Sequence, residues 1–561
     1  MLLGIDVGGT HVDGVLIREN KIHRKVKILV DSENLSKSLV KAIDELIETV
    51  DPTEIERVNL STTMSTNAIV EGNTSDVTLM TQRGPGINYT FDELNEETYF
   101  LSGYVDHRGK DVHPLDQSEL QEIKKQLEKK EDNLAVVTKF SPRNPVHEKE
   151  IADYFKGSFN HVTLGHKLSG RLNYPRRVNT AVLNSAVYDV YKKFSDNMTR
   201  ALRERGIDAP LFILKADGGT MTYQTARERP VETILSGPAA SFMGMWSLLD
   251  LSGSHILLDI GGTTADIFFI YNGSPVFERE GIEISKHKTL VRAIFSQSIG
   301  IGGDSYVRIE NGELKVGPER RGSSLAFGGS TLTLTDALVL LSEKKCSATV
   351  RAGFENLKNT FQSEIENIEI THEKLAEIII KQAIDKIYDE TTQWLDVLNS
   401  QPVETIQEIL EEEIISPSSL KLIGGPAKML EPYLSNRFSL PTERPEHDAI
   451  ANAIGTALAK PTFEVNLLAD TQQGIVSVPE VDLYESIASD YDLEKAKQLA
   501  REILTKEGRQ MGEINPEVEI IDASFFNMVD GYYFSKNIRV HAQLKPGLVT
   551  QLRGDKNESS K

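Results

Sequence analysis

The chain carries Gly4-Ile5-Asp6-Val7-Gly8-Gly9-Thr10 near its start and Leu257-Leu258-Asp259-Ile260-Gly261-Gly262-Thr263-Thr264 near its middle. Each stretch is a short apolar run that ends in an aspartate, followed by a Gly-Gly turn with hydroxyl groups and then a second apolar run. The second runs cover 12–17 and 267–270. This order predicts two β-hairpins whose tips carry no bulky side chain.

The residue types at these tips favour phosphate binding. Glycine lets backbone N–H groups approach an anion closely, and threonine hydroxyls add donors. An aspartate beside the turn can hold a divalent cation, directly or through water. A single Gly-Gly turn would fit an ordinary hairpin, but the same order twice predicts two related half-domains that close on a nucleotide. The predicted phosphate-binding residues are Gly8, Gly9, Thr10, Gly261, Gly262, Thr263 and Thr264.

Composition limits the class of protein. With 561 residues the chain is too long for one core, and its 39% hydrophobic and 26% charged content is typical of globular proteins. Cys346 is the single cysteine, which excludes an internal disulfide framework, a thiolate zinc site and an iron–sulfur cluster. The net charge of −21 argues against a nucleic-acid partner. We find no membrane-spanning run or signal peptide and expect a cytoplasmic protein.

The chain is expected to form three parts. Strand-like and helical runs alternate over 1–250, which predicts an α/β domain with insertions on its substrate side. A second α/β domain is predicted over 251–460, with a charged helical insertion at about 336–414. Residues 461–561 alternate strand-like runs around one helix, which predicts a small α+β domain.

Two further glycine pairs, Gly302-Gly303 and Gly424-Gly425, follow the second hairpin, and helices rich in small residues are expected at 236–244 and 449–457. In this order the features resemble the superfamily of actin, the sugar kinases and the ATP-driven heat-shock chaperones. That resemblance implies two ribonuclease-H-like (actin-type) domains around a nucleotide cleft. It also implies that the two helices cross at a hinge and that the loop with Gly424 and Gly425 contacts adenosine.

Within the superfamily, the chain is most similar to the hydantoinase/oxoprolinase family, hydantoinase A type. The similarity rests on both hairpins and on 61–68, 143–148, 217–221, 236–239, 316–318 and 335–336. It implies ATP and Mg²⁺ as cofactors and phosphorylation of a lactam, hydantoin or related carbonyl oxygen, or the equivalent step of a ketone carboxylase. It also implies a second, hydantoinase-B-like subunit. Asp6 and Asp259 are then the predicted catalytic residues and Mg²⁺ ligands. Whether the chain forms a homo-oligomer is left open.

Two segments depart from the family pattern. Residues 173–179 replace a Tyr-Glu-Arg-Thr-like stretch, and 323–328 lack the cysteine of a Pro-Ala-Cys-Tyr-Gly segment. These changes leave the predicted nucleotide site intact and leave the small-molecule substrate open.

Other polar residues are candidates for substrate contact. Thr63, Ser65 and Asn67 follow a strand-like run, where they could line a cleft or cap a helix. His147 follows Asn144-Pro145 and is either an acid–base or metal-binding residue or a structural histidine. Asp217, with Lys215, precedes a Gly-Gly turn that is either a ligand contact or a surface turn.

Two other functions remain open at this point. A small-molecule kinase of the same superfamily would release a stable phosphate ester. An ATP-switched activase module would control a protein partner and hydrolyse ATP slowly. Only the family resemblance favours the amide-activating function over these two.

Overall fold

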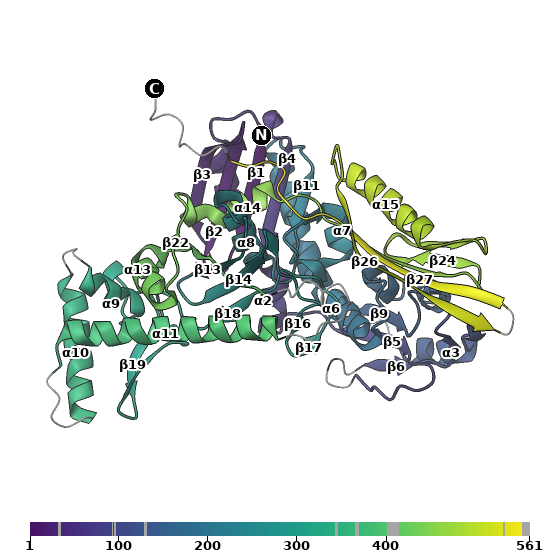
Figure 1. The fold of residues 1–561 in the computed structure, drawn as a ribbon, viewed down its shortest axis with the longest axis horizontal. Helices are drawn as coiled ribbons and strands as arrows, with labels where there is room; N and C mark the ends of the chain where they lie inside the picture. Colours follow the sequence, from purple (N-terminus) through teal and green to yellow (C-terminus); the bar gives the residue numbers. More distant parts are fainter. Residues whose placement is uncertain are drawn as a thin grey trace. The chain divides into compact units, whose positions relative to one another are not determined.

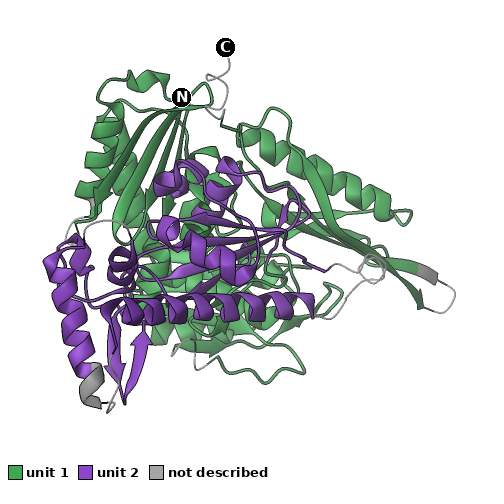
Figure 2. Ribbon diagram, turned by 60° about the vertical axis from the view of Figure 1, so that its left-hand side comes forward, with its two compact units in different colours: residues 1–240, 278–293, 456–561 green, residues 241–277, 294–455 purple. Residues whose placement is uncertain are grey.

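The computed structural model describes residues 1–31, 35–91, 94, 97–127, 132–342, 346–364, 370–400, 414–530 and 533–552. The described residues form two compact units (Figure 2). Unit 1 comprises 1–240, 278–293 and 456–561, and unit 2 comprises 241–277 and 294–455. The residues after 460 thus cluster with unit 1, and the three-domain division drawn from the sequence stays a prediction.

The N-terminal hairpin of unit 1 belongs to a mixed sheet (Figure 1). The strands, in sheet order, are β12 Thr220–Thr222, β11 Leu211–Leu214, β4 Arg57–Thr62, β1 Leu2–Val7, β2 His11–Arg18 and β3 Lys21–Leu29. β1 pairs antiparallel with β2 and parallel with β4, which pairs parallel with β11. The carboxyl ends of β1, β4 and β11 therefore share one edge, the edge at which ligands bind in such sheets.

Helices of unit 1 cover this sheet with apolar faces. In α1 (Leu35–Ile47), Leu39, Ile43 and Leu46 recur at helical spacing and join the same core as β1. The other helices near the sheet are α2 Met64–Glu71, α6 Tyr174–Glu204 and α7 Tyr223–Glu228. α6 begins after Asn173, whose side chain accepts a hydrogen bond from the backbone of Arg176 at 3.4 Å.

Unit 1 also contains a parallel sheet and an antiparallel sheet. The parallel sheet has the order β10 His161–Leu164, β9 Asn133–Thr138, β5 Val77–Gln82 and β6 Thr98–Phe100. Its helices are α3 Gln117–Gln126, α4 Val146–Tyr154 and α5 Gly165–Leu168. The antiparallel sheet has the order β25 Leu483–Ser486, β24 Ile475–Val478, β23 Glu464–Asp470, β27 Tyr533–Leu544 and β26 Val518–Asp530. α15 (Leu493–Gln510) packs on it through Ala496, Ala500 and Leu504.

Unit 2 is built around the second hairpin. Its sheet has the order β15 Ser274–Pro275, β14 Ala265–Tyr271, β13 His255–Ile260, β21 Ser419–Ile423 and β22 Thr442–Glu443, and β18 Gln297–Ile299 also pairs with β14. β19 Val307–Glu310 and β20 Glu313–Val316 form a separate hairpin. The helices are α9 Leu334–Leu341, α10 Ala348–Glu364, α11 His372–Asn399 and α13 Ala427–Phe438. Parts of the predicted helical insertion, 343–345, 365–369 and 401–413, lie outside the described residues.

Two helices lie where the sequence predicts helices rich in small residues. They are α8 Ser236–Leu248 and α14 Ala451–Leu458, and the chain passes between the units within each of them, after residues 240 and 455. A Cβ on Gly244 would lie 2.3 Å from the backbone oxygen of Ala451, so the helices approach most closely at a glycine. In the part of the chain that the structure describes, every helix is too short or too polar to cross a bilayer.

Candidate functional site

The tip of the first hairpin is open. Gly8 N donates to His11 O at 3.0 Å and closes the turn, and a Cβ on Gly9 would meet no heavy atom within 4 Å. Within the described ranges, the backbone N–H groups of Gly9 and Thr10 donate no hydrogen bond. Asp6, at the end of β1, is only 5% exposed and lies opposite Asp13 on β2.

The tip of the second hairpin repeats this geometry in unit 2. Gly261 N donates to Thr264 O at 2.8 Å, and Asp259 lies opposite Asp266. Ser241 Oγ donates to Asp259 Oδ2 at 2.6 Å, which orients the carboxylate. Among described residues, Gly262 and Thr263 have backbone N–H groups that donate no hydrogen bond. The donors at both tips are therefore available to an anion.

The segment with the glycine pair at 302–303 contacts the backbone of the second hairpin tip. Gly303 N donates to Gly261 O at 3.0 Å, and Asp304 N donates to Gly262 O at 2.6 Å. A Cβ on Gly302 would lie 2.6 Å from the carbonyl carbon of Gly262, so only glycine fits there without a shift of the tip. These contacts give Gly302 and Gly303 a direct structural link to the predicted phosphate-binding residues.

The loop after β21 also lies close to Asp259 and the second hairpin. Gly424 has a φ of +104°, and a Cβ there would lie 2.2 Å from Ile260 O and 2.9 Å from Asp259 Oδ1. The next residues include Gly425, at which a Cβ would meet no heavy atom within 4 Å, and Pro426, which packs against Gly303. The structure thus brings the predicted glycine residues of unit 2 together around Asp259.

The residues opposite the two predicted catalytic aspartates were missed from the sequence. Asp13 and Asp266 each follow the first aspartate of their hairpin by seven positions, a repeat that could have revealed them. Burial raises the pKa of Asp13, and Lys27, whose Nζ lies 2.7 Å from Asp13 Oδ2, opposes this rise. Burial and the charge of Asp259 raise the pKa of Asp266 to about 6, although a hydrogen bond with Ser298 of the neighbouring β18 opposes this rise.

These features fit the phosphates of a nucleotide together with a divalent cation. Open backbone N–H groups match phosphate oxygens, and carboxylate oxygens are the ligands that Mg²⁺ prefers in proteins. A cation would also relieve the repulsion between Asp259 and Asp266. Within the described ranges, no group of three or more His, Cys, Asp or Glu side chains is arranged to hold a metal ion.

The substrate candidates after β4 take different places. Thr63 N and Oγ1 approach Val7 O at 3.3 and 3.4 Å, so Thr63 adjoins the first tip. Ser65 is fully buried, and its Oγ lies 2.8 Å from Thr233 Oγ1. Asn67 is exposed and donates to Thr63 Oγ1 at 3.4 Å. Thr63 is thus the member of this group that lies beside a predicted phosphate-binding residue.

His147 lies inside unit 1. It is fully buried on α4, with Nδ1 2.8 Å from Gln82 Oε1 and Nε2 3.3 Å from Asp111 Oδ1. These contacts fit the structural alternative raised by the sequence. Its neighbour Glu148 accepts hydrogen bonds from the backbone of Thr138 at 2.8 Å and of His166 at 3.0 Å.

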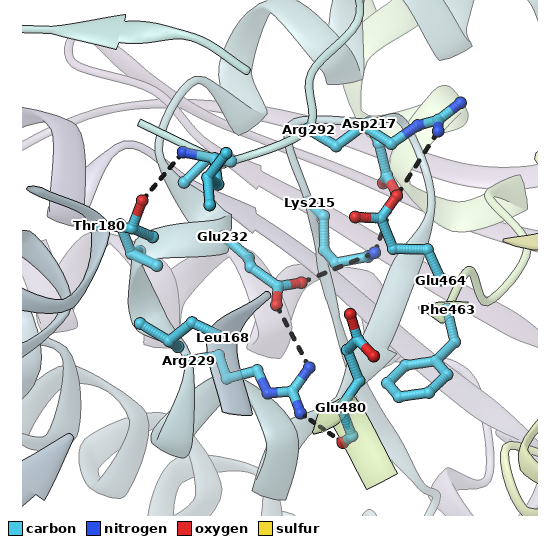
Figure 3. A pocket seen from close by; sticks show the side chains of 13 residues that line it. Leu168, Thr180, Lys215, Asp217, Arg229, Glu232, Arg292, Phe463, Glu464 and Glu480 are labelled. Carbon is cyan, nitrogen blue, oxygen red and sulfur yellow. Dashed lines mark hydrogen bonds and ion pairs between the residues drawn. The ribbon is translucent and has the colours of Figure 1, made fainter. Parts of the chain in front are cut away.

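Asp217 lines a cavity of unit 1 (Figure 3). Its carboxylate accepts hydrogen bonds from Lys215 Nζ, Gly219 N and Thr462 Oγ1, each at 2.9 Å. Lys215 and Asp217 are 7% and 6% exposed, so the surface-turn alternative is wrong. A Cβ on Gly219 would lie 2.0 Å from Thr462 Oγ1, which explains one glycine of this turn.

Comparisons with known proteins agree with the resemblance seen in the motifs. A family model described as hydantoinase/oxoprolinase matches residues 177–465, and the model of the family's N-terminal region matches 2–158. An uncharacterised protein of Methanocaldococcus jannaschii is 25% identical over 431 residues, 68% of this chain and 63% of that protein. The caprolactamase subunit alpha of Pseudomonas jessenii is 26% identical over 252 residues, 43% of this chain and 36% of that subunit.

Solved structures show the same fold. A crystal structure of the ATP-dependent caprolactamase from Pseudomonas jessenii has a TM-score of 0.71 at 18% identity, over 97% of this chain and 87% of that one. A nucleotide-free structure of acetone carboxylase has a TM-score of 0.67 at 14% identity, over 98% and 87%. The mixed α/β fold is shared with both. With the two family models together spanning most of the sequence, the chain belongs to the hydantoinase/oxoprolinase family.

Proposed function

We propose that the chain is an ATP-dependent hydrolase subunit that phosphorylates the carbonyl oxygen of a lactam, hydantoin or related cyclic amide. The observation that carries this proposal is the repeated hairpin, with a Gly-Gly turn whose following backbone N–H groups donate no hydrogen bond within the described residues and an aspartate near the end of its first strand in each unit. Family membership and the caprolactamase relative support the amide substrate. We further propose that the sheets holding the two hairpins are of the ribonuclease-H-like (actin-type) class.

We assign separate roles to the glycine turns and to the two aspartates. The N–H groups of Gly9, Thr10, Gly262 and Thr263 bind phosphate oxygens of ATP, and Asp6 and Asp259 orient the reacting groups or hold the cation. Bound Mg²⁺ supplies positive charge that neutralises the phosphates. An amide is a poor electrophile because its nitrogen donates into the carbonyl group. Phosphorylation of the oxygen makes the carbon atom a better electrophile. Water then attacks this carbon, the ring nitrogen takes up a proton and leaves as the C–N bond breaks, and a second water hydrolyses the resulting acyl phosphate to a carboxylate and free phosphate.

A ketone carboxylase subunit is the second candidate, because the fold is also that of acetone carboxylase. The relative named as a subunit alpha supports a further proposal, that a second, hydantoinase-B-like subunit completes the reaction. The aligned region covers 36% of that subunit, so the activity of the whole enzyme is a proposal for this chain.

An ATPase screen tests the proposed function. The purified chain is incubated with Mg²⁺ and ATP and with single lactams, hydantoins or ketones, with and without a candidate hydantoinase-B-like subunit from the same source. We expect phosphate release that depends on a cyclic amide. Absence of Mg-ATP binding by calorimetry would overturn the proposal, and accumulation of a stable phosphorylated product would identify a kinase instead.

A further inference from the structure

The cavity that contains Asp217 lies at the ligand-binding edge of the N-terminal sheet. Ile5 of β1 and Ile213 of β11 both pair with Leu60 of β4, so the two outer strands end at nearly the same level. Lys215 follows β11 directly. Since neighbouring strands are about 4.8 Å apart, Lys215 lies about 10 Å along this edge from the end of β1. That spacing suits a substrate pocket beside a phosphate site.

The walls of the cavity combine apolar side chains with charges of both signs (Figure 3). The apolar part consists of Leu168, Val231, Leu290, Val291 and Phe463. The charged part comes from the turn after β11, the segment before α8, Arg292, the start of β23 and Glu480. A small ring with polar edges would match such walls.

Most of the charged groups in the cavity have close partners. Lys215 Nζ donates to Asp217 Oδ2 at 2.9 Å, and Arg292 Nη1 lies 3.5 Å from Glu464 Oε2. Burial would lower the pKa of Lys215, but Asp217 and Glu232 outweigh it and raise that pKa. Burial would raise the pKa of Glu464, but His541 and Arg292 lower it. Both groups are therefore charged at neutral pH.

Glu232 differs from these groups. Its carboxylate lies 3.7 Å from Lys215 Nζ and 3.7 Å from Arg229 Nη1, which is longer than a hydrogen bond. Among the residues that the structure describes, none donates a hydrogen bond to this carboxylate at a shorter distance. Figure 3 shows the side chain between Lys215 and Arg229 at the centre of the cavity. A carboxylate held in this way is a ready acceptor for an N–H group of a ligand.

We propose that this cavity binds the nitrogen side of the substrate and that Glu232 accepts a hydrogen bond from its amide or ureide N–H. The inference rests on the proposed function, and it deepens it by making the N–H group a requirement. The apolar walls would cover the carbon atoms of the ring. A ketone or an N-alkylated amide has no N–H to offer and would cover the partly buried carboxylate, which is 23% exposed, without giving it a donor. A polar site discriminates against such a ligand.

Calorimetric binding of matched ligands tests the inference without requiring turnover. The probes are 2-pyrrolidinone and hydantoin, their N-methylated derivatives, and cyclopentanone, each added to the full chain with a Mg²⁺ complex of a non-hydrolysable ATP analogue. We expect at least one N–H ligand to bind the natural chain at least tenfold more tightly than its N-methylated form and than cyclopentanone. The preference should shrink in Glu232→Gln and vanish in Glu232→Leu.

Glu228→Gln is the matched control, because Glu228 lies four residues earlier, is exposed and does not line the cavity. It should keep the preference of the natural chain. Thermal melting and ATP-analogue binding establish that each variant is folded. Equal binding of N–H and N-methylated ligands, a preference that survives Glu232→Leu, or no binding of any probe by a chain that binds the ATP analogue would overturn the inference. Each of these results leaves the proposed function standing, whereas loss of ATP-analogue binding by the natural chain would overturn the proposed function.

Discussion

Asp266 lies directly opposite Asp259 in the ladder between β13 and β14, the place that Asp13 takes opposite Asp6 in the first hairpin. The two hairpins therefore have the same backbone arrangement, but the charged groups around their aspartates differ. Lys27 forms an ion pair with Asp13, whereas Ser298 is the neighbour of Asp266 across the next strand pair. Burial and the charge of Asp259 raise the pKa of Asp266, and a cation beside these two carboxylates would relieve their repulsion.

Asp6→Asn and Asp259→Asn should each lower ATP hydrolysis by about a hundredfold or more, because the amide keeps the shape but removes the charge. Both residues end a strand beside a glycine turn, so we expect the fold to survive. Steady-state phosphate release and thermal melting measure the two effects. Asp490→Asn, on the surface beside Lys495, is the control and should behave like the natural chain. Near-normal turnover in either test variant would make that aspartate a turn residue only.

Gly302→Ala should weaken binding and hydrolysis of ATP. The new Cβ would meet the backbone of Gly262 and push the second tip away, and a shift of about 1 Å in such a site costs on the order of a hundredfold in rate. Calorimetry with an ATP analogue and phosphate release report the effect. Gly547→Ala, whose Cβ would have its nearest neighbour at 3.8 Å, serves as the control. Unchanged affinity and rate in Gly302→Ala would separate this segment from the nucleotide site.

Gly244→Ala should destabilise the contact between α8 and α14. The added Cβ would lie 2.3 Å from a backbone oxygen, Ala451 O, which cannot move without the helix, so we expect a loss of about 1–3 kcal/mol in unfolding free energy. Denaturant unfolding followed by circular dichroism measures this loss. In Gly353→Ala the nearest atom is the end of the flexible Leu325 side chain, and a smaller effect is expected there. Equal stability of the two variants would contradict a tight helix crossing at Gly244.

The buried group around His166 should make stability depend on pH. His166 Nδ1 lies 2.6 Å from Glu148 Oε2, and its Nε2 lies 3.8 Å from Asp482 Oδ1. Burial would lower the pKa of His166, but Asp482 and Glu148 raise it above 6.5; burial would raise the pKa of Glu148, but His166 and Arg177 lower it below 4.5. The contribution of His166 to folding stability is fully present below pH 6.5 and is lost as the pH rises through its raised pKa. The contribution of Glu148 to folding stability is present above pH 4.5 and is lost as the pH falls through its lowered pKa.

Glu148→Gln should therefore cost most between pH 4.5 and 6.5, by about 3–5 kcal/mol, because it leaves a buried charged histidine without its nearest carboxylate. Melting temperatures of the natural chain and the variant at pH 6 and pH 9 measure the difference. The difference in melting temperature between the two proteins should narrow at pH 9, because the stabilising effect of the charged His166 is lost as the pH rises through its raised pKa. A gap that is constant over this range would show that Glu148 acts only as an acceptor for backbone N–H groups.

Local patterns predicted the elements that carry the hairpins. Apolar runs on either side of a Gly-Gly turn predicted both hairpins, which are β1 with β2 and β13 with β14. These patterns depend on residues that are neighbours in the chain, and the same holds for the helix now seen as α15. The roles of the predicted site residues and the domain boundaries stay predictions.

Contacts between distant parts of the chain could not be predicted in this way. The sequence left a ligand contact and a surface turn open for Asp217, because Thr462, which covers it, follows 245 residues later. A role for Glu232 could not be predicted from the sequence, because its contacts with Lys215 and Arg229 form in a cavity that several elements line together. His147 has a side chain suited to catalysis, and only its complete burial against Gln82 shows a structural setting.

Transfer of an isotope from amide to phosphate tests carbonyl phosphorylation most directly. A cyclic amide that stimulates ATP hydrolysis is labelled with ¹⁸O at its carbonyl oxygen and converted in ordinary water by the chain, with its partner subunit where turnover requires it. If ATP phosphorylates the carbonyl oxygen, water attacks the carbon atom and the C–N bond breaks. A second water then hydrolyses the acyl phosphate at the same carbon, so the labelled oxygen leaves with phosphate. Mass spectrometry should find one ¹⁸O in each phosphate released by the coupled reaction. Unlabelled phosphate, formed while the amide is consumed, would contradict the proposed reaction.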